Sequence, residues 1–180
     1  NKNRLINDLI KEEKNKVNPY SIFDVQITNF HEAKRQLLNA LSIASLYYTL
    51  KDNSNILFNP TTFIFYGKAN EGYFIAKEMI DKDFLLKDKI KIVFIENIDV
   101  TKARLILPAV DIYNNLTIEN LDNIDFGLLQ ASFNMANIIS TDAGILGNKK
   151  IGNSIYKVEK NIENENMKAV DSYYSNHRLK

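Results

Sequence analysis

Residues 121–147, LDNIDFGLLQASFNMANIISTDAGILG, are the most informative segment for the fold class, because they contain a helix pattern, a strand pattern and a turn in succession. Its acidic start leads into an apolar segment that is predicted to be helical up to about Met135. The β-branched run Asn137–Thr141 is typical of a buried strand. Asp142 ends that strand, and the Ala143-Gly144 pair after it indicates a turn. The stretch is therefore predicted to be a helix followed by a strand of a parallel sheet.

The lengths of this helix and strand predict that two acids meet. A helix of roughly 12 residues spans about 18 Å, and a strand of about 5 residues spans about 16 Å. In a right-handed crossover the helix runs back across the sheet and the strand returns, so Asp125 and Asp142 should lie at the same carboxyl edge. Two such carboxylates repel each other unless a cation or a proton lies between them. Each also has a structural explanation, because Asp125 suits a helix N-terminus and Asp142 suits an Asx turn.

The composition excludes several classes of site. The 180 residues are 45% hydrophobic and carry a net charge of +1, which suits one compact domain without a strong field for nucleic acid. There is no cysteine and there are only two histidines, so disulfides, thiolate chemistry and the usual zinc sites are not expected. No signal peptide or apolar run of transmembrane length is visible, and a cytoplasmic location is expected.

Helix and strand patterns alternate along the rest of the chain. A helix over 31–50 is predicted to bury one apolar face, and another is predicted within 101–114, interrupted at Pro108. The predicted buried face consists of Ala33, Leu37, Leu41, Ala44 and Tyr48. Short apolar strands are expected at 20–23, 56–58, 90–95, 137–141 and 154–158.

This alternation predicts an α/β fold, a three-layer arrangement of a mainly parallel sheet flanked by helices. We expect a single domain over 1–180, with 1–18 as an N-terminal helical extension and 161–180 as a C-terminal helical tail. On this interpretation four strand ends bring acids or amides to one rim of the sheet: Asp24, Asn59, Glu96 and Asp142.

Carboxylates without histidine or cysteine favour the hard cations Mg²⁺ and Mn²⁺, which suit phosphate chemistry. Such an ion lowers the pKa of a bound water and neutralises the leaving oxygen of a phosphodiester. The sequence has no P-loop, no dinucleotide-binding glycine motif and no nucleophile elbow. The absence of these motifs argues against an NTPase, an NAD enzyme and a serine hydrolase.

The segment LDNIDFGLLQASFNMANIISTDAGIL resembles the C-terminal half of PIN-domain ribonucleases. Its ending STDAGI is most similar to the protein-only RNase P branch, as are ILFNPTTF at 56–63 and ILPAVDIYNNL at 106–116. The resemblance implies a PIN fold, which is a small parallel sheet with helices on both faces.

The same resemblance implies a metal-dependent endoribonuclease that cleaves RNA phosphodiesters, with tRNA precursors as a candidate substrate. Asp24, Asp125 and Asp142 would be the catalytic acids and would hold Mg²⁺ or Mn²⁺, with Asp122 as an accessory metal ligand. RNA would be the partner, and the relatives imply self-association as a homo-oligomer.

Two alternatives stay open. Val25 and Gln26 follow Asp24 where the family has threonine and then serine or asparagine, and no acid lies near Tyr66, where the family has its second acid. These departures favour a catalytically degenerate PIN-like module for RNA binding or protein assembly. The other alternative is an α/β module of another family that binds a nucleotide or a partner protein, its acids only capping helices.

Overall fold

The structure is a computed structural model, and it describes residues 1–8, 10, 17–31, 34–53, 55–68, 89–96, 99–117, 126–141 and 155–158. Six strands form one sheet in the order β3-β2-β1-β4-β5-β6, and every pair of neighbouring strands is parallel. The strands are β1 (Ile22–Ile27), β2 (Thr61–Gly67), β3 (Ile90–Glu96), β4 (Ile112–Asn115), β5 (Asn137–Thr141) and β6 (Ile155–Val158). The helices are α1 (Lys2–Asp8), α2 (Gln36–Asp52), α4 (Val100–Ile106), the 3-10 helix η2 (Leu107–Ala109) and α5 (Phe126–Phe133).

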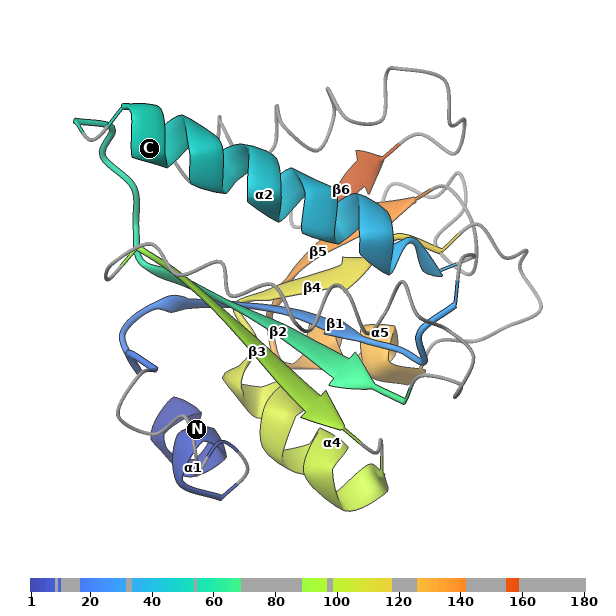
Figure 1. Cartoon of the computed structure of the whole chain (residues 1–180). Helices are drawn as coiled ribbons and strands as arrows, with labels where there is room; N and C mark the ends of the chain where they lie inside the picture. Colours follow the sequence, from blue (N-terminus) through green and yellow to red (C-terminus); the bar gives the residue numbers. More distant parts are fainter. Residues whose placement is uncertain are drawn as a thin grey trace.

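The helices cover both faces of the sheet, which confirms the predicted three-layer α/β fold. Helix α2 lies across one face, and α1, α4 and α5 lie on the other (Figure 1). The alternation of side chains along each strand supplies a separate apolar core to each face. On β1, for example, Phe23 and Val25 belong to the core beneath α1 and α4, whereas Ile22 packs against the core beneath α2.

Each core is built mainly from bulky apolar residues. The core beneath α2 contains Phe63 and Phe65 of β2, Ile112 of β4, and Ile43, Leu46 and Leu50 of the helix. The core on the opposite face contains Leu5, Val25, Tyr66, Ile106, Tyr113, Leu128 and Ile138. Burial of these side chains on both sides explains why the strands read as apolar runs.

The buried face of α2 differs from the predicted one. Leu37, Leu41 and Tyr48 are exposed by 41%, 48% and 55%. The residues that face the sheet are Gln36, Asn39, Ser42, Ile43, Leu46 and Leu50. The prediction was wrong because α2 carries apolar residues on both sides, and two of the polar side chains turned inward, Gln36 and Asn39, find hydrogen-bond partners there.

Two further predictions of local structure were wrong. Residues 56–58 form no strand, because β2 begins only after Pro60. The helical segment that begins in α4 ends at Ala109 in η2, beside Pro108, and Ile112–Asn115 forms β4 between β1 and β5. The strands at 90–95, 137–141 and 154–158 were predicted within a residue of their observed bounds. The predicted C-terminal tail at 161–180 lies outside the described residues.

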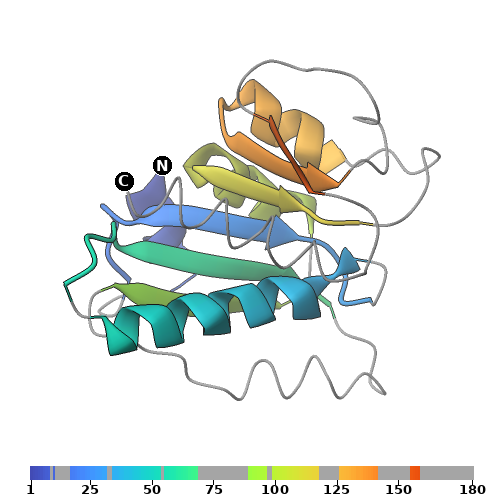
Figure 2. The same cartoon turned by 90° about the horizontal axis from the view of Figure 1, so that it is seen from above.

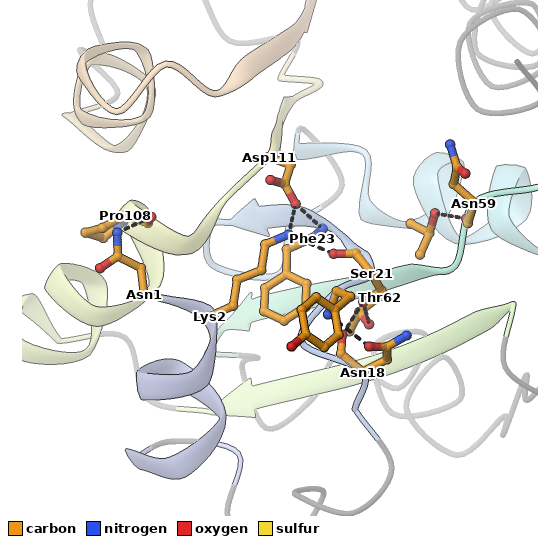
Figure 3. A network of polar contacts seen from close by, with 11 residues as sticks. Asn1, Lys2, Asn18, Ser21, Phe23, Asn59, Thr62, Pro108 and Asp111 are labelled. Carbon is orange, nitrogen blue, oxygen red and sulfur yellow. Dashed lines mark hydrogen bonds and ion pairs between the residues drawn. The ribbon is translucent and has the colours of Figure 1, made fainter.

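A polar latch joins α1 to the starts of β1 and β4 (Figure 3). The Nζ atom of Lys2 lies 2.5 Å from Oδ2 of Asp111 and donates a 2.7 Å hydrogen bond to the Ser21 carbonyl oxygen. The backbone N–H of Phe23 donates to the same Asp111 oxygen at 2.7 Å, and the Lys2 ammonium lies 4.8 Å from the centre of the Phe23 ring. The latch, made by Lys2, Ser21, Phe23 and Asp111, therefore ties together segments about 90 to 110 residues apart.

Candidate functional site

The strand order places a topological switch point between β1 and β4. The chain leaves β1 towards β2 and β3 on one side of the sheet, then returns to β4 and continues to β5 and β6 on the other. In open parallel sheets, ligands bind outside the carboxyl ends of the strands at the point where this direction reverses. The candidate site is therefore the switch-point edge, which comprises the ends of β1 and β4 and the described residues of the β1–α2 loop, 28–31 and 34–35.

The described part of the β1–α2 loop carries basic residues. It carries His31, which is exposed, Lys34, which is half-buried, and Arg35, which is buried. Burial lowers the pKa of the Arg35 guanidinium, although an arginine keeps its charge at any ordinary pH. A cation that has lost part of its hydration interacts more strongly with an anion than one in bulk water.

Arg35 is also the residue at which the loop turns into α2. Its backbone has the left-handed conformation, with φ of 54°, which is uncommon for a residue other than glycine. The 17-residue helix that follows points its N-terminus towards the same edge as the carboxyl ends of the strands (Figure 2). The first N–H groups of a helix lack partners within it and carry a partial positive charge. The loop and the helix start together favour an anionic ligand.

Two buried glutamines hold the loop in place. Gln26 Nε2 donates to the Lys34 carbonyl oxygen at 2.9 Å, and Gln26 Oε1 accepts from Asn39 Nδ2 at 3.0 Å. Gln36 Nε2 donates to the Asn29 carbonyl oxygen at 2.8 Å. The His31 backbone N–H donates to Gln36 Oε1 at 3.4 Å. Both ends of each side-chain amide are therefore used to fix the backbone of the loop or the first turns of α2.

The loop is also tied to the neighbouring strand. The backbone N–H of Thr28 donates to the Tyr66 carbonyl oxygen, and that of Phe30 donates to the Lys68 carbonyl oxygen, both at 3.0 Å. Gly67 lies between these two acceptors, and a Cβ atom there would lie 2.1 Å from the Thr28 carbonyl oxygen. Only glycine lets the loop pass this close to β2.

Asp24 lies deeper in the fold than predicted. The sequence placed it at the end of a strand, but β1 continues to Ile27, and Asp24 lies within the strand with 2% of its surface exposed. It accepts a hydrogen bond from Asn114 Nδ2 on the adjacent strand β4. The pair therefore joins the two strands of the switch point beneath α2, rather than projecting from the sheet edge.

Most of the other predicted acids lie beyond the part of the chain that the structure describes. Asp122, Asp125 and Asp142 lie outside the described residues, so their gathering stays a prediction. Asn59 precedes β2 rather than following a strand, which places it at the opposite edge of the sheet from the end of β3 at Glu96. Within the ranges that the structure describes, no group of three or more histidine, cysteine or acidic residues could hold a metal ion.

The sequence contained a signal for this site that the search for acids missed. The segment HEAKRQ, residues 31–36, places two adjacent basic residues immediately before an apolar helix pattern. Basic residues at a helix N-terminus oppose the helix dipole and so are unfavourable unless they serve another purpose. This departure pointed to an anion at the start of the helix.

Comparison with known proteins identifies a different family from the predicted one. A family model described as carbohydrate phosphorylase matches residues 1–176. The chain is 36% identical to the liver form of glycogen phosphorylase from Bos taurus over 154 residues, which cover 80% of this chain and 18% of that protein. It is 39% identical to glycogen phosphorylase from Bacillus subtilis over 138 residues, which cover 71% and 17%. The chain thus spans less than a fifth of the length of these relatives.

These matches overturn the predicted PIN-domain ribonuclease, including the protein-only RNase P branch and the degenerate PIN-like module. RNA as a partner and tRNA precursors as a substrate are wrong for the same reason, and the homo-oligomer implied by that resemblance loses its basis. The predicted Mg²⁺ or Mn²⁺ cofactor is wrong as well, because carbohydrate phosphorylases typically use pyridoxal phosphate. None of the helices in the described part of the chain has the length and apolar character of a membrane span.

Proposed function

This chain belongs to the carbohydrate phosphorylase family. We propose that it forms the phosphate-binding part of a site for glycogen phosphorolysis. The family match over residues 1–176 carries this proposal, because it covers nearly the whole chain and both sides of the switch point. In phosphorolysis the bond from C1 of the terminal sugar to the glycosidic oxygen breaks, and a phosphate oxygen forms the new bond to C1. The departing glucan oxygen takes the proton that the attacking hydrogen phosphate loses.

The role of this chain in that reaction is to bind and orient the phosphate. A phosphate dianion approaching a sugar needs its charge neutralised and its attacking oxygen aligned. The β1–α2 loop carries Lys34 and Arg35 beside the N-terminus of α2, a combination that favours oxyanions. The remaining parts of the glycogen site would come from sequence beyond the fifth of the relatives' length that this chain spans.

The described residues do not fit an anchor for pyridoxal phosphate. That cofactor supplies an acid-base or electrophilic group held by a lysine Schiff base. Every lysine whose surroundings the structure describes is at least partly exposed, whereas a Schiff-base lysine needs a desolvated pocket. No step of the proposed reaction is assigned through this group.

Three predictions from the sequence remain part of the proposal. The chain is taken as a single domain over 1–180, with 1–18 as a helical extension and 161–180 as a tail. Asp24 is retained as a site residue because its pairing with Asn114 joins the two strands of the switch point. Asp122, Asp125 and Asp142 are retained as candidate site residues without a metal, and the location is taken as cytoplasmic.

Binding of inorganic phosphate to the full chain tests the proposal directly. We expect Lys34→Met to weaken phosphate binding by about tenfold or more, since one good charge-assisted contact contributes about 1.5–3 kcal/mol. Titration calorimetry measures the dissociation constant. Lys51→Met is the matched control, because Lys51 is exposed at the last turn of α2, the far end of the helix from the loop.

The enzymatic part is tested by supplying glycogen and inorganic phosphate and measuring the release of glucose 1-phosphate. If the unchanged chain does not bind inorganic phosphate, the proposed phosphate-binding role is wrong. Equal phosphate affinity in Lys34→Met and Lys51→Met would show that the β1–α2 loop is not the binding element.

A further inference from the structure

The two glutamines of the switch-point edge occupy positions where apolar side chains would normally pack. Gln26 points from β1 into the layer beneath α2 with 3% of its surface exposed, and Gln36 faces the same layer from the helix, also with 3% exposed. Burying an amide is unfavourable unless its polar atoms are paired. The partners of the two glutamines are the loop backbone and Asn39, so these hydrogen bonds stabilise one conformation of the loop.

The geometry requires an amide rather than another polar group. The Gln26 amide nitrogen donates to the Lys34 carbonyl oxygen, and the Gln26 amide oxygen accepts from Asn39 Nδ2. At Gln36 one end donates to the Asn29 carbonyl oxygen and the other accepts from the His31 backbone N–H. A carboxylate of the same shape offers acceptors only, so it would leave one carbonyl oxygen of the loop without its donor.

We propose that Gln26 and Gln36 are positioning residues that set the conformation of the β1–α2 loop, and through it the affinity for a phosphate-bearing ligand. They contact the carbonyl oxygens of Lys34 and Asn29, and so fix both halves of the loop that carries the basic side chains. Neither glutamine touches the ligand. This inference rests on the proposed function for the identity of the ligand, but the ordering of the loop is measurable without one.

Gln26→Glu in the full chain is the first test, because it keeps the shape and removes only the donor. Above the pKa of the new carboxyl group, which burial raises, we expect about tenfold or greater weakening of inorganic phosphate binding, since small misplacements of a binding group have effects of this size. Below that pKa the protonated acid can donate to the Lys34 carbonyl oxygen again, and the affinity should recover towards that of the unchanged chain.

The pH comparison is made against the unchanged chain at each pH. Asp24 on the same strand face and His31, Lys34 and Arg35 in the loop are charged or titratable groups near the substituted side chain. They are common to both proteins, as is the titration of phosphate itself, so the difference between the two proteins isolates the new carboxyl group. A purely structural role would change stability without this recovery of affinity at low pH.

Hydrogen exchange gives a reading that needs no ligand. The backbone N–H groups of Phe30 and Lys34 are hydrogen-bonded within or beside the loop. We expect their exchange to quicken by about tenfold or more in Gln26→Glu at neutral pH, because loss of one tie frees the loop to open locally. Asn53→Asp is the matched control, since it introduces the same charge at an exposed position past the far end of α2.

The outcomes separate the inference from the proposed function. If the unchanged chain binds no phosphate, the proposed function fails, and the exchange rates alone decide the positioning role. If the unchanged chain binds phosphate and Gln26→Glu matches Asn53→Asp in affinity and exchange, the inference fails. Should Gln26→Glu not fold, Gln36→Glu is measured in the same way, with the Asn29 carbonyl oxygen as the group that loses its donor.

Discussion

Tyr66 connects the sheet to helix α4 through a single hydroxyl group. Its Oη accepts a 2.8 Å hydrogen bond from the Asp99 backbone N–H and lies 3.3 Å from the Asp99 carbonyl oxygen. Asp99 in turn caps α4, its side chain accepting from the Lys102 backbone N–H at 2.7 Å. The buried phenol therefore holds the residue that begins the helix.

We expect Tyr66→Phe to lower the free energy of unfolding by about 0.5–1.5 kcal/mol at pH 8, because the hydrogen bond between its hydroxyl group and the Asp99 backbone N–H is lost. Burial raises the pKa of Tyr66; the hydrogen bond with the Asp99 backbone opposes this rise, and the Asp99 charge adds to it. Stability from the protonated phenol is therefore full below the unfolded pKa of about 10 and is lost as the pH rises through the higher folded pKa. Urea unfolding of both proteins from pH 8 to pH 11 measures this.

The difference in unfolding free energy between the two proteins should narrow above about pH 10. Every other ionisable group is common to the two proteins and cancels in the comparison. A difference that stays constant over this range would contradict the role assigned to the Tyr66 hydroxyl proton.

Asp24 shows what a single residue in the sequence can and cannot indicate. The sequence placed it correctly next to an apolar strand segment, but a strand end and a strand interior look alike when the following residues are Val25-Gln26-Ile27. Its depth depends on Asn114, which is 90 residues away and provides the hydrogen bond that makes burial of the carboxylate tolerable.

At the scale of elements, α2 is the clearest case of a helix whose orientation the sequence leaves open. Apolar residues occur on both sides of it, so a spacing of three and four residues can be drawn on either side. The structure turns Ile43, Leu46 and Leu50 towards the sheet and leaves Leu37 and Leu41 exposed. Gln36 and Asn39 decide between the two, because only this rotation pairs them with the loop and with Gln26.

A pair of alanine substitutions distinguishes the observed rotation from the predicted one. Ile43→Ala should lower the free energy of unfolding by about 2–5 kcal/mol, since Ile43 is buried in the core beneath α2. Leu41→Ala should change it by no more than about 0.5 kcal/mol, since that side chain is half exposed. Both values come from urea unfolding, and the reverse order would show that Leu41 faces the sheet.

Pro60 marks the start of β2, not the end of a strand before it. The short apolar run 56–58 was predicted as a strand that Asn59-Pro60 closes, yet the strand begins after the proline and runs from Thr61 to Gly67. A proline suits a position just outside a strand at either end, because it lacks a backbone N–H for the ladder. The pairing of β2 with both β1 and β3 selected the second segment.

At the scale of the whole molecule, the polar latch of Lys2, Ser21, Phe23 and Asp111 joins the first helix to the edge of the sheet opposite the candidate site. Asp111 receives two donors, one from α1 and one from the backbone of β1. The pair is only partly exposed, with 25% of the Lys2 side chain and 41% of the Asp111 side chain accessible. The contribution of the Lys2–Asp111 pair to the free energy of unfolding is therefore modest, but larger than that of a fully solvated ion pair.

A double-mutant cycle with Lys2→Met and Asp111→Asn should give a coupling free energy of about 0.5–1 kcal/mol, decreasing as salt is added. Urea unfolding of the four proteins supplies the values. Arg4→Met with Asp8→Asn is the control, because that pair lies 3.6 Å apart on the exposed surface of α1 alone. If the coupling free energy of Lys2 and Asp111 is no larger than that of Arg4 and Asp8, the Lys2–Asp111 contact does not hold α1 to the sheet.

The layered α/β class and several strands could be predicted from local patterns, because β-branched runs such as Asn137–Thr141 fit the buried, pleated surface of a sheet. It did not determine the site or the family inferred from short acidic motifs, since acids before turns and at helix starts occur in many α/β proteins. The strand order, the rotation of α2 and the burial of Asp24 became known from the folded chain alone. Each of these depends on partners far apart in the chain, whose burial and hydrogen bonding exist only once the sheet has formed.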